Sequence, residues 1–280
     1  MSRARAVPRI LARRGDLVVE RDPRRPSGRL LRCGDMDASY VDLADPGHLE
    51  FDYLRWMRKV LGAARARRVL HVGGGACALA RTLAAADPGG RQEVCEIDPH
   101  VLALAREHCG LRRAPGLHVR QADGRAFIAV QPDASWDAVV IDAFVGAVLP
   151  PRLITAQALL DVARVARLAL VNVVDDRPAH VVRAVAGGLA AAYPRVWGLG
   201  ARAGNNTVVV GCAADLDLDL DRIAADAAAD PSPARLTAPA AMTRLMSGSP
   251  ALRDEGLTAL AASAPRTLTA PAASAPRTTT

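Results

Sequence analysis

Five predicted strands of this sequence each end in an acidic side chain or in a glycine turn. These residues are Gly73–Gly75, Glu96 with Asp98, Asp123, Asp142, and Asp175 with Asp176. In a parallel sheet, ligands bind beyond the carboxyl ends of the strands, where the strand order reverses. Any one of these acids can instead cap the helix that follows it. The complete series predicts a ligand site along one edge of a sheet.

The glycine turn is the first part of that site. Gly73, Gly74 and Gly75 let the backbone approach a ligand closely, and the helix that follows presents free N–H groups. Gly73, Gly75 and Ala78 fit the dinucleotide-binding fingerprint. Glu96 lies 23 residues after Gly73, near the roughly 20 expected for an acid that binds ribose hydroxyls. The spacing predicts a ribose-bearing ligand, either NAD or an adenosyl sulfonium.

Two more strand ends carry acids. Asp123 precedes Gly124, so its carboxylate can either accept a bond from an adenine amino group or cap a helix. Asp142 ends the apolar strand WDAVVID, and no helix clearly starts after it. A partly desolvated carboxylate of this kind is suited to binding a cation or taking a proton.

Alternating elements must position these residues. Short apolar strands at 68–75, 91–98, 117–123, 135–144 and 168–176 are each followed by a helical pattern, and a pair of strands at 195–201 and 205–213 ends the series. Repeated strand–helix units predict an α/β fold, with a doubly wound, mostly parallel, seven-stranded Rossmann-like sheet. The final two strands, joined by a short polar turn, predict an antiparallel hairpin.

The chain is expected to divide into four parts. Residues 1–15 are predicted to be a loose basic terminus, 16–48 a small β-element, 49–260 the ligand-binding domain, and 261–280 a disordered tail rich in Ala, Pro and Thr. An amphipathic helix over 46–64 carries Tyr53, Trp56 and Met57 at helical spacing.

Composition narrows the classes of function. The formal charge is +7, but the arginines lack the interleaved aromatics or known module of a nucleic-acid-binding protein, so no nucleic-acid partner is expected. Five scattered cysteines without a Cys-x-x-Cys pair predict reduced thiols, no metal site and a cytoplasmic location. No signal peptide or membrane span is predicted.

The motifs together resemble the spermidine synthase family of polyamine aminopropyltransferases, which have a class I methyltransferase-like fold. The resemblance covers about Asp16 to Ala213. It rests on VLHVGGG, on CEID as a ribose-binding segment, on ADGRAFI, on WDAVVIDAF, and on LEFDYLRWM as the helix that brings a substrate-side tyrosine.

The resemblance implies a role for each matched residue. Asp142 would be the catalytic carboxylate and Tyr53 would line the amine pocket. The cofactor, decarboxylated S-adenosylmethionine or S-adenosylmethionine itself, would be bound by Gly73, Gly74, Gly75, Glu96, Ile97, Asp123 and Gly124. The partner would be a small amine or related acceptor, and the family resemblance favours a homodimer.

Three positions depart from the family pattern. Ala76 stands where the family usually has an acid, Val145 stands where it usually has a second acid, and Leu54 replaces a polar side chain. Each lost charge-assisted partner costs on the order of 1.5–3 kcal/mol. Ordinary putrescine chemistry is therefore expected to be weakened.

Alternatives remain on the same fold. One is a methyltransferase that uses S-adenosylmethionine, which the loss of the acid at Ala76 favours. Another is a non-catalytic, nucleoside-binding relative. An NAD-dependent oxidoreductase is disfavoured by the terminal hairpin and by Asp123.

Overall fold

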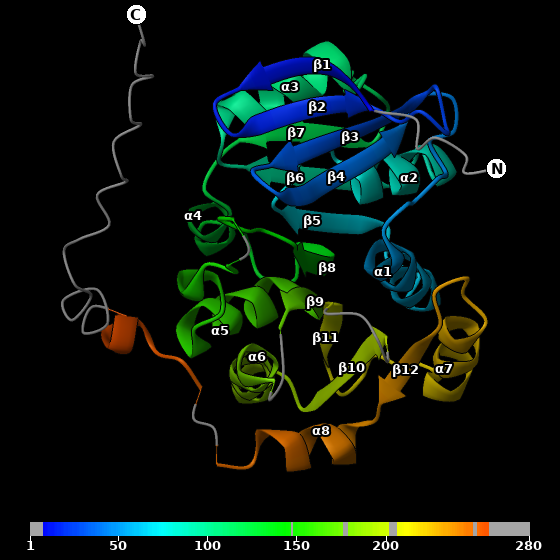
Figure 1. Ribbon diagram of the computed structural model, residues 1–280. Helices are drawn as coiled ribbons and strands as arrows, with labels where there is room; N and C mark the ends of the chain where they lie inside the picture. The colour runs from blue at the N-terminus through cyan, green and yellow to red at the C-terminus, as the bar shows by residue number, and fades with distance from the viewer. Residues whose placement is uncertain (1–7, 147, 176–178, 202–205, 249–250, 258–280) are drawn as a thin grey trace, which may run out of the picture.

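A twisted eight-stranded sheet forms the centre of the molecule (Figure 1). The computed structural model describes residues 8–146, 148–175, 179–201, 206–248 and 251–257. Five strands are parallel: β5 (Arg68–Val72), β6 (Arg91–Glu96), β7 (Leu117–Gln121), β8 (Trp136–Ile141) and β9 (Ala166–Val174). Three are antiparallel: β10 (Arg195–Ala201), β11 (Asn206–Cys212) and β12 (Ala234–Thr237). The order is β12-β10-β11-β9-β8-β5-β6-β7.

Helices cover both faces of this sheet because its strands are apolar on both sides. On β5, Val69 belongs to one hydrophobic cluster and Leu70 to the other. Helices α1 (Asp52–Ala63), α2 (Ala78–Ala86), α3 (Pro99–His108) and α7 (Leu220–Ala228) lie on one face. Helices α4 (Gly124–Ala129), α5 (Ala156–Val165), α6 (His180–Ala192) and α8 (Pro239–Met246) lie on the other. This is the layering expected of a doubly wound fold.

A second, four-stranded antiparallel sheet lies over α2 and α3 (Figure 1). Its strands are β1 (Arg9–Arg14), β2 (Leu17–Arg21), β3 (Gly28–Cys33) and β4 (Met36–Asp42), in that order. The expectation of a loose segment over 1–15 is wrong for Arg9–Arg14. These residues pair with β2, because backbone hydrogen bonds to an adjacent strand order even a strongly basic segment.

The predicted fold is confirmed, with one addition. The parallel sheet and the terminal hairpin form as expected, and β12 extends the sheet by an eighth strand beside β10. The predicted tail at 261–280, and Asp176, lie outside the described residues. Within the described ranges, no helix has the length and apolar character needed to cross a bilayer.

Candidate active site

The site lies where the chain order of the sheet reverses, between β5 and β8. After β5 the next strands, β6 and β7, lie to one side, and β8 and β9 lie to the other. The ends of β5 and β8 touch, because the Asp142 N–H donates to the Val72 carbonyl at 2.9 Å. A Cβ on Gly73 would lie 2.2 Å from the Asp142 carbonyl oxygen, and Gly73 has a φ of +90°. Only glycine therefore allows the turn to pass beside Asp142.

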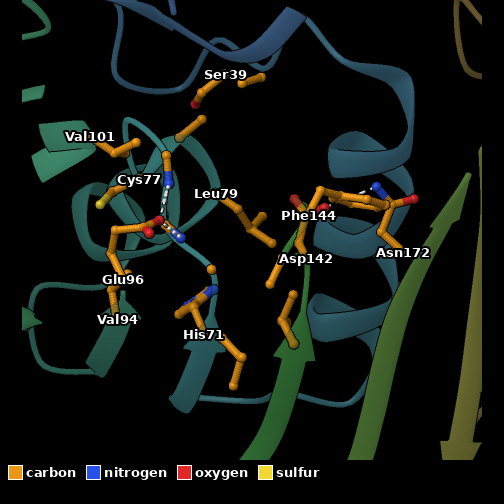
Figure 2. A pocket seen from close by; sticks show the side chains of 18 of the residues that line it. Ser39, His71, Cys77, Leu79, Val94, Glu96, Val101, Asp142, Phe144 and Asn172 are labelled. Carbon is orange, nitrogen blue, oxygen red and sulfur yellow. Dashed lines mark hydrogen bonds between the residues drawn. The ribbon is translucent and has the colours of Figure 1, made fainter. Parts of the chain in front are cut away.

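Glu96 holds the glycine turn from the end of β6. One carboxylate oxygen accepts the N–H groups of Gly74 (2.9 Å) and Gly75 (3.1 Å), and the other accepts the Asp98 N–H (3.0 Å). Figure 2 shows Glu96 on one side of the cavity, with Asp142 and Asn172 on the other. Glu96 is buried and borders the cavity. It therefore orders the loop in addition to the ribose contact predicted for it.

The N-terminal sheet closes the other side of the glycine turn. Ser39 on β4 accepts the Ala76 N–H at 3.1 Å, and a Cβ on Gly75 would meet the Ser39 Cβ at 2.9 Å. Ala76 is 0 % exposed and does not border the cavity. The position where the resembled family usually has an acid is therefore filled by packing against β4.

Asp142 is held by two side chains from different elements. The Tyr53 hydroxyl on α1 donates to Oδ2 at 3.1 Å, and the Asn172 amide on β9 donates to Oδ1 at 2.9 Å. Burial raises the pKa of Asp142 above its ordinary value, although both hydrogen bonds act in the opposite direction. Burial also raises the pKa of Tyr53 well above its usual range, and the Asp142 charge adds to this. The pair thus presents a desolvated carboxylate that can take a proton or bind a cation.

Asp123 occupies a different position from the other predicted acids. It caps α4 by accepting the Arg125 N–H at 2.9 Å, and it forms an ion pair with Arg152. These contacts lower the pKa of Asp123 against the opposing effect of desolvation. Gly124 and Arg152 border the cavity, but Asp123 is not among the bordering residues. The Asp123 carboxylate is therefore engaged by the start of α4 and by Arg152.

These elements enclose a cavity of about 820 Å³, within the range that suits a small ligand. Gly73–Gly75, Ile97, Gly124 and Tyr53 all border it, so the structure brings together most of the predicted residues. Ile97 is 56 % exposed, although it is a large apolar residue. The bordering carboxylates are Asp37, Asp52, Glu96, Asp98 and Asp142, and Arg152 is the one bordering Arg or Lys among the described residues.

Several site residues were not predicted. Asn172 is 1 % exposed inside an apolar strand, and its side-chain amide oxygen Oδ1 has no partner among the described residues. A buried amide within such a run is itself a signal, because buried polar groups are normally paired. Ser39, Asp52 and Arg152 carried no comparable local signal. Asp98 caps α3, and Asp175 accepts the N–H groups of Val181 and Val182 in the first turn of α6. No cluster of His, Cys, Asp and Glu suited to a metal is found in the described part of the chain.

Solved structures with this architecture are known. The chain matches no protein-family model. A probable spermidine synthase from Corynebacterium glutamicum superposes with a TM-score of 0.78 at 24% identity, covering 89% of this chain and 97% of that one. The fold is that of the spermidine synthases. The spermidine synthase of Thermotoga maritima gives 0.59 at 14% identity, covering 91% and 88% of the two chains.

A methyltransferase shares the fold less closely. Human methyltransferase-like protein 13, in complex with SAH, gives a TM-score of 0.54 at 18% identity, covering 75% of this chain and 99% of that one. Proteins with this fold thus include both spermidine synthases and a methyltransferase.

Proposed function

We propose that this chain is a transferase that binds an adenosyl sulfonium and passes an aminopropyl group from decarboxylated S-adenosylmethionine to an amine. The observation that carries the proposal is the Asp142 carboxylate, which Tyr53 and Asn172 hold beside the glycine turn. Neighbours of this fold provide support, since one was solved with SAH and a spermidine synthase was solved with the transition-state analogue AdoDATO.

The residues of the cavity fit a nucleoside cosubstrate. The glycine turn offers bare backbone, Glu96 offers a carboxylate at the end of β6, and Ile97 offers an exposed apolar surface for a ring. Five bordering carboxylates against one arginine also favour a cationic ligand, in a chain whose own charge is +7.

The sulfonium supplies an electrophilic carbon and a neutral thioether leaving group. Asp142 first pairs with the acceptor ammonium and then takes its proton, so that the free amine forms the new C–N bond as the C–S bond breaks. The Tyr53 hydroxyl and the Asn172 amide fix both carboxylate oxygens. Holding the amine in line with the C–S bond contributes a large part of the acceleration.

The proposal is tested by calorimetric titration with S-adenosylmethionine and with its decarboxylated form, followed by mass spectrometry of the products. We expect tighter binding of the decarboxylated form and an amine product heavier by one aminopropyl group. Binding of neither nucleoside would contradict the proposal.

A methyltransferase is the second candidate, and the buried, uncharged Ala76 favours it. No acid at this position faces the cofactor to disfavour a carboxylate. Tighter binding of S-adenosylmethionine together with a product heavier by one methyl group would decide for this candidate.

A further inference from the structure

Beside Asp142, the cavity has an apolar wall formed by the segment after β8. Phe144 and Val145 border the cavity there, and Val145 is 74 % exposed. The segment is held in place by a two-way backbone bridge, in which the Val145 N–H donates to Val148 at 2.9 Å and the Val148 N–H donates back at 3.2 Å. The bridge therefore holds the backbone that presents the Val145 side chain at the cavity.

A second part of the cavity wall comes from the start of α1. The Phe51 ring stacks on the Tyr53 ring with centroids 5.9 Å apart, and both residues border the cavity with Leu54. Asp52 is the carboxylate that the start of α1 contributes to the border of the cavity. It accepts the Tyr53 N–H at 2.7 Å. Asp142 thus adjoins two segments whose aromatic and aliphatic side chains border the cavity.

We infer that the acceptor is a monoamine, with one ammonium group and an apolar body, rather than a diamine. This inference rests on the proposed function. The reacting nitrogen is taken by Asp142, so the rest of the acceptor lies against Phe144, Val145 and Phe51. A second ammonium placed against these three side chains would lose water without gaining a charged partner from them, which is costly. A methylene chain or a ring in the same place buries apolar surface and gains from it.

A matched pair of ligands tests the inference. Putrescine and n-pentylamine have the same number of heavy atoms and differ in a terminal ammonium against a terminal methyl group. Their dissociation constants are measured by calorimetry, with and without saturating methylthioadenosine, the nucleoside product of the proposed transfer. We expect n-pentylamine to bind at least about tenfold more tightly, since an unmet charged partner corresponds to a tenfold change or more.

Two variants test whether the Val145 side chain causes the preference for n-pentylamine over putrescine. Val145→Asp should reverse it, by giving the far ammonium a partner at the cavity wall. Val148→Asp is the matched control, because Val148 is 61 % exposed in the same segment but does not border the cavity. It should keep the preference for n-pentylamine.

The outcomes separate the inference from the proposed function. Equal or tighter binding of putrescine, or binding of neither amine, overturns the inference. If putrescine binding is lost in Asp52→Asn, the second ammonium belongs at Asp52 and the inference is overturned. Preferential binding of n-pentylamine without formation of an aminopropyl product supports the inference and contradicts aminopropyl transfer.

Discussion

Asp142 is an acid whose environment opposes its own charge. It lies in a cavity wall at the end of an apolar strand, and the two neutral donors Tyr53 and Asn172 only partly offset the lost hydration. A buried carboxylate of this kind lowers the stability of the fold, because its ionised form is poorly solvated until a cation binds. Its position therefore indicates a functional role.

Asp142→Asn should therefore abolish turnover and stabilise the fold at neutral pH. The new side chain is neutral, so its burial carries no charge penalty. We expect turnover to fall by at least about a hundredfold, in line with loss of a general base, while nucleoside affinity stays nearly constant. Steady-state kinetics and calorimetry measure the two effects, and unchanged turnover would remove Asp142 from the mechanism.

The stability effect of this variant depends on pH. Between its ordinary pKa of 3.8 and its raised native value, Asp142 keeps its proton in the folded state and loses it in the unfolded state. Wild-type stability therefore falls as pH rises through that window, and the advantage of the variant grows. Asp137→Asn, at the other end of β8, is the control, and its effect on the stability at neutral pH should have the opposite sign. Asp137 accepts the N–H groups of Arg67 and Arg68, which lower its pKa, so this variant should lose stability at neutral pH.

Glu96→Gln tests the acid at the end of β6. The glutamine oxygen can still accept bonds from Gly74 and Gly75, but its amide would face the Asp98 N–H. We expect a loss of stability on the order of 1–3 kcal/mol for the unmet donor and about a tenfold weaker affinity for adenosyl ligands. Urea unfolding and calorimetry measure these. Lower stability with unchanged affinity would show that Glu96 only holds the loop.

At the scale of elements, a buried ion cluster fixes the helix that carries Tyr53. Asp230, in the turn after α7, pairs with Arg55 at 3.0 Å and Lys59 at 2.9 Å, both on α1. The same Arg55 donates to the carbonyls of Leu49 and Glu50 just before α1 begins. The turn after α7 thus holds the first part of α1 in place through Arg55 and Lys59.

Asp230→Ala should destabilise the protein by about 3 kcal/mol, because it leaves two partly buried cations without their carboxylate. Asp226→Ala is the control, since the pair of Asp226 with Arg222 is exposed and such pairs contribute about 0–1 kcal/mol. Thermal and urea unfolding compare the two variants. Equal effects would contradict the anchoring role of Asp230.

The elements and the glycine turn were predictable because their signals are local. Strand and helix periodicity, the glycines before α2 and the acid that ends β8 are all read from neighbouring residues. The pairing of Asp230 with Arg55 joins positions 175 residues apart, and nothing near either one indicates the other. Strands β1 and β12 were missed for the same reason, since each is ordered by a neighbouring strand and not by its own pattern.

Asp123 and Asn172 illustrate the same limit within the site. The sequence leaves a ligand contact and a helix cap open for Asp123, and the structure shows the cap and the Arg152 pair. Asn172 reaches Asp142 only because β8 and β9 are adjacent in the sheet.

For the molecule as a whole, the buried His71 makes folding sensitive to acid. It lies on β5 with Nε2 3.0 Å from the Gln92 amide oxygen, and burial lowers the pKa of His71 to about 4. As pH falls from 6.5 to about 4, the unfolded chain takes a proton that the folded chain does not. Stability is therefore complete above the unfolded pKa and decreases through this window, by on the order of 3 kcal/mol in total.

His71→Asn should remove most of that dependence, whatever it does to stability at neutral pH. Urea unfolding across the window gives the slope of the unfolding free energy against pH for both proteins. An identical slope in the variant would assign the acid sensitivity to other groups.

The contact between α1 and the turn after α7 also provides a built-in reporter of local opening. Lys59 is the one lysine of the sequence, and its ammonium is held by Asp230 and by the Asp226 carbonyl. A lysine-specific protease can therefore cut this chain at one peptide bond only, and that bond lies inside a helix. The rate of this single cut, read by mass spectrometry, measures how often α1 separates from the rest of the native protein. Ligands that order the site should slow it.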